Sequence, residues 1–213
     1  MAIKPILFNT EMVRAILDRR KTCTRRVIKL PENMDGIPVG KGGDSSNPLG
    51  FMYPGCIKRP QYQPGDILYV RETWKKAPNG YYYYEDWQRN DIADVTKWKP
   101  SIHMPKEAAR IWLKVTDVRV ERLQDITEDG VWNEGFRFTP PCLTRVSADG
   151  HTCDLDGPCT SHIKYCVMTM GELFGRELWD KTIKKSDLDR YGWSANPYVL
   201  VIEFERCEKS EGV

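Results

Sequence analysis

The sequence predicts an α+β fold, a small mixed β-barrel with flanking helices, and three features lead to this prediction. Alternating or continuous apolar residues mark three strands, at 67–72, 110–123 and 198–205. Two segments, 10–20 and 172–179, have the amphipathic spacing of helices. The alternation in the middle strand breaks near Thr116 and Asp117, where a bulge or bend would suit a small barrel.

The composition is that of one ordinary domain. A chain of 213 residues can bury its own core, and its 40% hydrophobic and 29% charged residues are close to average. No apolar run approaches the roughly 18 residues of a membrane span, and the N-terminus lacks the apolar core of a secretory signal. We therefore expect a single domain, 1–213, in the cytoplasm.

Positive charge is concentrated at the N-terminus, although the net charge of the chain is only +2. Residues 1–30 hold eight Lys or Arg against Glu11 and Asp18. The densest part, residues 19–26, mixes cations with hydroxyl groups, and such a patch attracts anions such as phosphate. A solvated surface without a partner is an equal alternative for this charge run.

An amphipathic helix precedes this basic segment and determines where it lies. Asn9 or Thr10 can cap the helix, which should run for about ten residues. If residues 21–26 then formed one straight strand, Lys21 and Thr24 would point to opposite faces. The two side chains can cooperate only if the chain turns directly after the helix.

The buried strand at 67–72 ends in two charged residues, Arg71 and Glu72. Charges at the end of a buried strand commonly line a pocket, which makes both residues candidates for substrate binding. An ion pair at the edge of the sheet is the alternative.

Long insertions are expected near 31–60, 75–105 and 139–166. Recurring Gly and Pro predict mostly loop in the first. The second holds four consecutive tyrosines, 81–84, near Trp87 and Trp98. Aromatic residues beside basic ones can stack on bases. A two-stranded flap over an edge of the core is favoured, because consecutive tyrosines face both sides of a strand.

Seven cysteines without a secretory signal indicate thiols or metal ligands instead of disulfides. Four of them lie in the third insertion, with two histidines between them: Cys142, Cys153, Cys159 and Cys166. These residues suffice for a structural zinc site. The sequence has no Cys-x2-Cys pair, so a loop with free thiols is favoured over zinc.

A short helix is predicted between Thr127, which can cap its start, and Gly135, which can end it. Glu134 then sits in the last turn, where unpaired backbone carbonyls disfavour a second negative charge. A carboxyl group that keeps its proton is a better acid catalyst. A solvated surface glutamate is the alternative.

Taken in order, these segments resemble the ASCH family, the activating-signal cointegrator homology domains, which have a PUA-like barrel. The pieces that carry the resemblance are the helix leading into Arg20-Lys21-Thr22-Cys23-Thr24-Arg25, the turn 64–68, the strand 110–122, the helix 127–135 and the closing strand 199–205. Residues 70–74 and 193–197 are similar to longer members carried by phages and prophages. The resemblance spans most of the chain outside the three insertions.

The resemblance implies a function. Small bacterial members of the family hydrolyse N4-acetylcytidine to cytidine and acetate with a Lys, a Thr and a Glu, which match Lys21, Thr24 and Glu134. It implies that Thr24 is the nucleophile, that Lys21 activates it, and that Glu134 donates a proton or binds the base. No cofactor is required for this reaction.

The charged residues around this site suggest binding roles, and the resemblance also implies a second function. Arg20, Arg25 and Arg26 become candidates for binding substrate or phosphate, together with Arg71 and Glu72. Other family members resemble RNA-binding modules or are linked to ribonuclease activity. An RNA- or DNA-binding module that uses the basic patch is therefore the alternative, and the expected partner is a modified nucleoside or a nucleic acid, with no membrane.

Overall fold

The computed structural model describes residues 1–29, 37–39, 50–53, 56–58, 60–89, 97–137 and 168–209. The chain divides into two compact units. The first consists of Met1–Glu121 with Val199–Val213, and the second of Arg122–Tyr198. Within the described residues, no helix has the length and apolar character needed to cross a membrane.

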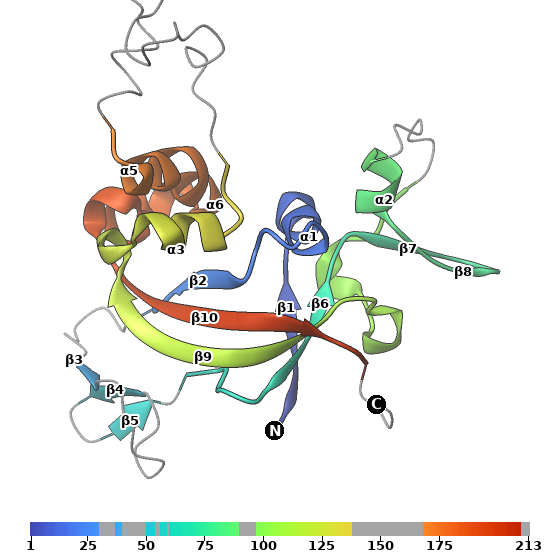
Figure 1. Ribbon diagram of the computed structural model, residues 1–213, viewed down its shortest axis with the longest axis horizontal. Coiled ribbons are helices and arrows are strands. Elements are labelled where there is room, and N and C mark those ends of the chain that lie inside the picture. Colours follow the sequence, from blue (N-terminus) through green and yellow to red (C-terminus); the bar gives the residue numbers. More distant parts are fainter. Residues whose placement is uncertain are drawn as a thin grey trace, which may run out of the picture. The chain divides into compact units, whose positions relative to one another are not determined.

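A five-stranded sheet organises the first unit (Figure 1). Its strands, in spatial order, are β1 (Ile3–Leu7), β6 (Ile67–Arg71), β9 (Trp112–Arg122), β10 (Tyr198–Cys207) and β2 (Cys23–Val27). The pairing is parallel between β1 and β6, and antiparallel between β6 and β9 and between β10 and β2. The predicted mixed fold with strands at 67–72, 110–123 and 198–205 is confirmed.

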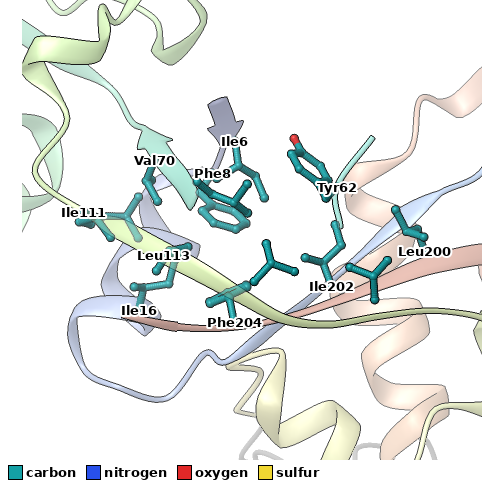
Figure 2. Close-up of a cluster of buried hydrophobic side chains, with 14 residues drawn as sticks. Ile6, Phe8, Ile16, Tyr62, Val70, Ile111, Leu113, Leu200, Ile202 and Phe204 are labelled. Carbon is teal, nitrogen blue, oxygen red and sulfur yellow. The ribbon is translucent and has the colours of Figure 1, made fainter. Parts of the chain in front are cut away.

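One face of this sheet carries the main core cluster (Figure 2). Its largest members are Ile6, Phe8, Ile16, Tyr62, Leu68, Ile111, Leu113, Ile202 and Phe204. They come from four strands, from α1 and from the segment before β6, so residues far apart in the sequence share one interior. Burying each such side chain contributes about 1.5–3 kcal/mol, which makes this cluster the main source of stability in the unit.

The sheet is open between its edge strands, because its order ends at β1 on one side and at β2 on the other. A side chain nevertheless links the two edges. Arg26 of β2 donates a hydrogen bond of 2.7 Å to the carbonyl oxygen of Leu7, the last residue of β1. The sheet therefore curves far enough to bring its edges within reach of one arginine, without backbone pairing between them in the described residues.

Helix α1 (Thr10–Leu17) follows β1 and begins as predicted. The side chain of Asn9 accepts a hydrogen bond of 2.8 Å from the N–H of Met12, which satisfies one of the free donors of the first turn. The apolar face of the helix is buried in the core through Val13 and Ile16. The helix ends at Leu17, earlier than expected.

The second insertion contains the predicted two-stranded flap, formed by β7 (Trp74–Ala77) and β8 (Gly80–Tyr83). A short helix that the sequence analysis missed, α2 (Tyr84–Arg89), follows β8 directly. Two 3-10 turns, η1 (Ser101–His103) and η2 (Lys106–Ala108), lead back to β9. The flap packs on a second core cluster, which includes Ile67, Tyr69, Trp74, Met104 and Trp112.

The first insertion, expected to be mostly loop, contains a three-stranded antiparallel sheet. Its strands are β3 (Ile37–Val39), β4 (Gly50–Tyr53) and β5 (Cys56–Lys58). Strands of three or four residues are too short to give a clear alternating pattern, and the surrounding Gly and Pro obscured them.

The second unit is helical in its described part. Its α3 (Glu128–Asn133) is capped by Thr127 as predicted, and Gly135 ends it in a left-handed conformation (φ 81°). The predicted helix at 172–179 is a longer run: α5 (Met170–Phe174), a π-helical turn η5 (Gly175–Trp179) and α6 (Asp180–Thr182). Shorter turns complete the unit: η3 (Leu123–Asp125), η6 (Lys185–Asp187), α7 (Leu188–Tyr191) and η7 (Trp193–Ala195).

Candidate functional site

Lys21 lies in a turn directly after α1, and this turn carries its side chain into the interior. Arg19 adopts a left-handed conformation (φ 59°), and the N–H groups of Arg20 and Lys21 both donate to the carbonyl of Ala15. Only 3% of Lys21 is exposed, and its Nζ lies 5.7 Å from the ring centroid of Phe8. Phe8 belongs to the main core cluster, which Figure 2 shows, and the contact with its ring therefore places the lysine amine against the core.

Thr24 is the second residue of β2, and its register shows which face it occupies. It lies directly opposite Ile202 of β10, and opposite residues of an antiparallel pair point to the same face. Ile202 belongs to the same core cluster as Phe8, so Thr24 faces this core and is only 1% exposed. Lys21 and Thr24 therefore face one interior, and the required turn after the helix is present.

An open pocket of about 530 Å³ lies where the C-terminal end of α1 meets the end of β10. Lys21 and Thr22 line it, together with Phe204 and Cys207, whereas Thr24 is not among its lining residues. Burial and the nearby Glu205 raise the pKa of the Cys207 thiol, against a smaller opposing effect of Lys114. A protonated thiol is a poor nucleophile, so Cys207 is not favoured as a reactive group in this pocket.

Three of the four arginines of the basic segment have partners within the protein, and the fourth, Arg19, is exposed. Arg25 donates to Oε1 of Glu121 through Nε at 3.0 Å and through a terminal nitrogen at 2.7 Å, and its side chain is 2% exposed. Arg26 binds the Leu7 carbonyl and lies 5.4 Å from the ring centroid of Phe8. The third, Arg20, is half-buried and pairs with Asp18 at 3.1 Å.

A network of charges surrounds the Arg25 pair on the opposite face of the sheet. Arg25 lies opposite Val201, one residue from the core-facing Ile202. Its partner Glu121 also accepts a hydrogen bond from Arg119, which in turn forms ion pairs with Asp117 and Glu203. The chemistry of this face is therefore that of a structural ion network, distinct from the amine and hydroxyl on the core face.

Glu72 forms an ion pair at the end of β6, which favours the structural alternative over a pocket-lining role. Both of its carboxylate oxygens accept hydrogen bonds of 2.9 Å from Arg110. Arg110 also binds Asp86 of α2 at 2.7 Å, and its guanidinium lies 4.1 Å from the ring centroid of Tyr83. Arg71 donates a hydrogen bond of 3.2 Å to a backbone carbonyl in η1.

Glu134 belongs to the second unit, where it is the C-cap residue of α3. Its N–H donates to the carbonyl of Gly130 at 3.1 Å, and the residue is 5% exposed. The predicted place at the end of the helix is confirmed, and the solvated alternative is wrong for this residue. The four cysteines predicted to bind zinc, Cys142, Cys153, Cys159 and Cys166, lie outside the described residues.

The sequence analysis missed the residues that hold the site together. Phe8 lies against both Lys21 and Arg26, and Glu121 binds Arg25 from 96 positions away. Arg110, which holds Glu72, was not singled out either. The one available signal was the apolar run that contains Phe8, because it ends immediately before the helix cap.

Comparisons of the chain with protein-family models, with curated proteins and with solved structures found no match. A functional proposal therefore rests on the side chains described above and on the resemblance of the sequence motifs.

Proposed function

We propose that the protein hydrolyses the amide of an N4-acylated cytidine or a related modified pyrimidine nucleoside, and that its curved sheet is a PUA-like barrel. The observation that carries this proposal is the shared orientation of Lys21 and Thr24 toward one interior. Residues three apart in a straight strand would face opposite ways. Here both lie on the core side, Lys21 against Phe8 and Thr24 opposite Ile202, after a turn that is left-handed at Arg19.

The two side chains supply complementary chemistry. The Thr24 hydroxyl is a weak nucleophile and needs a neighbouring base. A neutral Lys21 amine accepts its proton while the oxygen attacks the amide carbon. The carbon–nitrogen bond then breaks, the cytosine amine leaves with a proton, and water hydrolyses the resulting threonine ester to release the carboxylate. By the resemblance, Glu134 donates the proton to the leaving amine or binds the base.

The engagement of the arginines favours this proposal over a phosphate-binding basic patch. Arg25 is buried in a pair with Glu121, and Arg26 is bound to Leu7 and Phe8. Withdrawing either guanidinium to bind a phosphate would break these contacts. Lys21 lies against Phe8 and also lines the open pocket, so it connects the pocket with the interior that Thr24 faces.

The experiment is a panel of N4-acylcytidines incubated with purified protein, with release of carboxylate and cytidine followed by chromatography. We expect turnover of at least one member and loss of at least about a hundredfold in kcat/KM for Lys21→Ala, Thr24→Val and Glu134→Gln, within the range of acid–base and nucleophile deletions. Thr116→Val is the matched control, because this exposed threonine of β9 carries the same hydroxyl and does not line the pocket. Absence of turnover across the panel, or full activity of Thr24→Val, would refute the proposal.

A further inference from the structure

The flap formed by β7 and β8 has an inner and an outer face. Three aromatic side chains of the hairpin pack against the second core cluster: Trp74, Tyr81 and Tyr83. Lys75 lies directly opposite Tyr82 in the hairpin register. Because strand side chains alternate, Lys75 and Tyr82 lie on the other face, away from this core. Both are half-buried, and in Figure 1 the hairpin extends beyond the five-stranded sheet.

Trp98 extends this outer face. Its neighbour Lys99 pairs with Trp74 in an isolated antiparallel bridge, and the Lys99 ammonium lies 5.2 Å from the ring centroid of Trp74, on the inner side. Trp98 instead makes edge contacts with two rings of α2, Tyr84 at 5.3 Å and Trp87 at 5.7 Å between centroids. Half-buried aromatic rings from β8, from α2 and from the segment after it are thus gathered outside the core cluster.

Two acidic side chains of α2, the helix that follows the flap, are bound to arginines. Glu85 is buried and accepts a hydrogen bond of 3.1 Å from Arg14, and Asp86 is held by Arg110. Among the described residues, four lysines of the flap and of the segment after α2 have no carboxylate within ion-pair distance: Lys75, Lys76, Lys97 and Lys99. Three of these lysines are exposed and one is half-buried. Lys76 lies 5.7 Å from the ring centroid of Tyr81, so Lys76 belongs to the inner side, as Lys99 does. The hairpin register places Lys75 on the outer face beside Tyr82, where it has no carboxylate partner among the described residues.

We propose that the outer face of this flap binds single-stranded nucleic acid. Tyr82 and Trp98 stack on bases, and Lys75 and the exposed Lys97 beside Trp98 bind the phosphates. Aromatic rings accept any base because every base has a π-face, and a positive groove beside them follows the backbone. A duplex hides its base faces, and an acidic peptide would use the lysines without using the rings. The site is separate from Lys21 and Thr24, so it is independent of the hydrolysis proposed above.

Binding is measured by fluorescence anisotropy with labelled oligo(U) and oligo(dT) of about 12 nucleotides, a length within the usual site size of one such surface. The two probes show whether RNA or DNA is preferred, and a blunt duplex is the third probe. We expect affinity for a single strand that exceeds affinity for the duplex. Tyr82→Ala and Trp98→Ala should each weaken it about tenfold, whereas Tyr82→Phe, which keeps the ring, should bind like the wild type.

The lysines are tested through the salt dependence of the same binding, between about 50 and 200 mM salt. Each of Lys75→Gln and Lys97→Gln should lower the slope of log K against log salt by roughly 0.7, whereas Lys76→Gln, on the inner side of the hairpin, should leave it unchanged. The matched control is Lys184→Gln with Lys185→Gln, which removes two exposed lysines from the second unit and should leave the slope unchanged.

Four results would overturn the proposal: no binding of either single strand at about 50 mM salt, equal affinity for the duplex, wild-type affinity of both alanine variants, or an equal loss in the Lys184 and Lys185 control. Thermal unfolding of each variant separates lost folding from lost binding, and Tyr82→Phe and Lys75→Gln disturb the fold least. Lys21→Ala should retain full affinity for the oligonucleotides, so failure of the hydrolysis assay and failure of this assay are distinguishable.

Discussion

Two regions of the first unit are rich in positive charge, and they use it in opposite ways. In the basic segment, residues 19–26, three of the four arginines are bound by internal partners, Glu121, Asp18 and the Leu7 carbonyl, and Arg19 is exposed. In the flap the lysines are spread thinly along the sequence, yet none of the four has a carboxylate partner among the described residues. The density of basic residues in a sequence therefore does not locate the surface that attracts anions; the pairing of those residues does.

The largest expected effect comes from breaking the Arg25 pair in the basic segment. Glu121→Gln removes the carboxylate that neutralises a guanidinium whose side chain is 2% exposed. Removal of one partner of a buried pair leaves an uncompensated charge, so we expect the free energy of unfolding to fall by about 3 kcal/mol. Urea denaturation measures this change, and the double variant Arg25→Met with Glu121→Leu should recover most of the lost stability.

An exposed ion pair that also involves β9 provides the control. Lys114 of β9 lies 3.7 Å from Glu205 of β10, and both side chains are more than half exposed. Water and side-chain entropy reduce the value of such a pair, so Glu205→Gln should change the free energy of unfolding by less than about 1 kcal/mol. Equal losses for Glu121→Gln and Glu205→Gln would contradict the structural role of the Arg25 pair.

The second prediction concerns the carboxylate that anchors the flap. Burial raises the pKa of Glu72 above its ordinary value of 4.5, and the hydrogen bonds and charge of Arg110 only partly oppose this effect. The folded protein therefore binds a proton at Glu72 more readily than the unfolded chain does. The resulting stability is fully present below about pH 4.5 and is lost as the pH rises through the folded-state pKa. Glu72→Gln cannot titrate, so its free energy of unfolding should lack this decline.

Asp66 supplies a control of opposite sign. Burial raises its pKa, but hydrogen bonds from Lys4 and from the N–H groups of Ala2 and Gln63 lower it more, so the net shift is downward. Its contribution to stability is present above the ordinary value of 3.8 and is lost as the pH falls. Urea denaturation of the wild type, Glu72→Gln and Asp66→Asn between about pH 3 and 8 should therefore separate two opposite slopes. Parallel pH profiles for the wild type and Glu72→Gln would refute the effect at Glu72.

The fold was largely predictable where one local rule determined an element. Asn9 and Thr127 cap α1 and α3 because their side chains accept from the first turn, and the long apolar alternation of β9 marks it as a strand. The helix α2 was missed because Tyr84 continues a run of tyrosines typical of a strand. The π-helical turn at Gly175 was missed because such turns have no sequence pattern of their own; the ring of Trp193 lies where a side chain on Gly175 would be.

The candidate site was predictable as residue types but not as geometry. Sequence spacing left open whether Lys21 and Thr24 share a face, because a non-glycine residue with positive φ, here Arg19, has no sequence signal. The internal use of Arg25 depends on Glu121, 96 positions away. Contacts of this kind are set by strand pairing through β10, which one sequence does not show. The role of Glu134 as a proton donor stays a prediction.

The smallest expected effect is the change in the free energy of unfolding when the flap loses its two lysine charges. The double variant Lys75→Gln with Lys76→Gln should change the free energy of unfolding by no more than about 0.5 kcal/mol, because neither side chain has an ion pair to lose among the described residues. Urea denaturation of this double variant and of Glu121→Gln under the same conditions compares the two losses of stability directly. A loss above about 1 kcal/mol would mean that the lysines support the fold. Unchanged stability together with weakened oligonucleotide binding would mean that the positive charge of the flap serves ligand binding. The positive charge of the basic segment, by contrast, stabilises the fold.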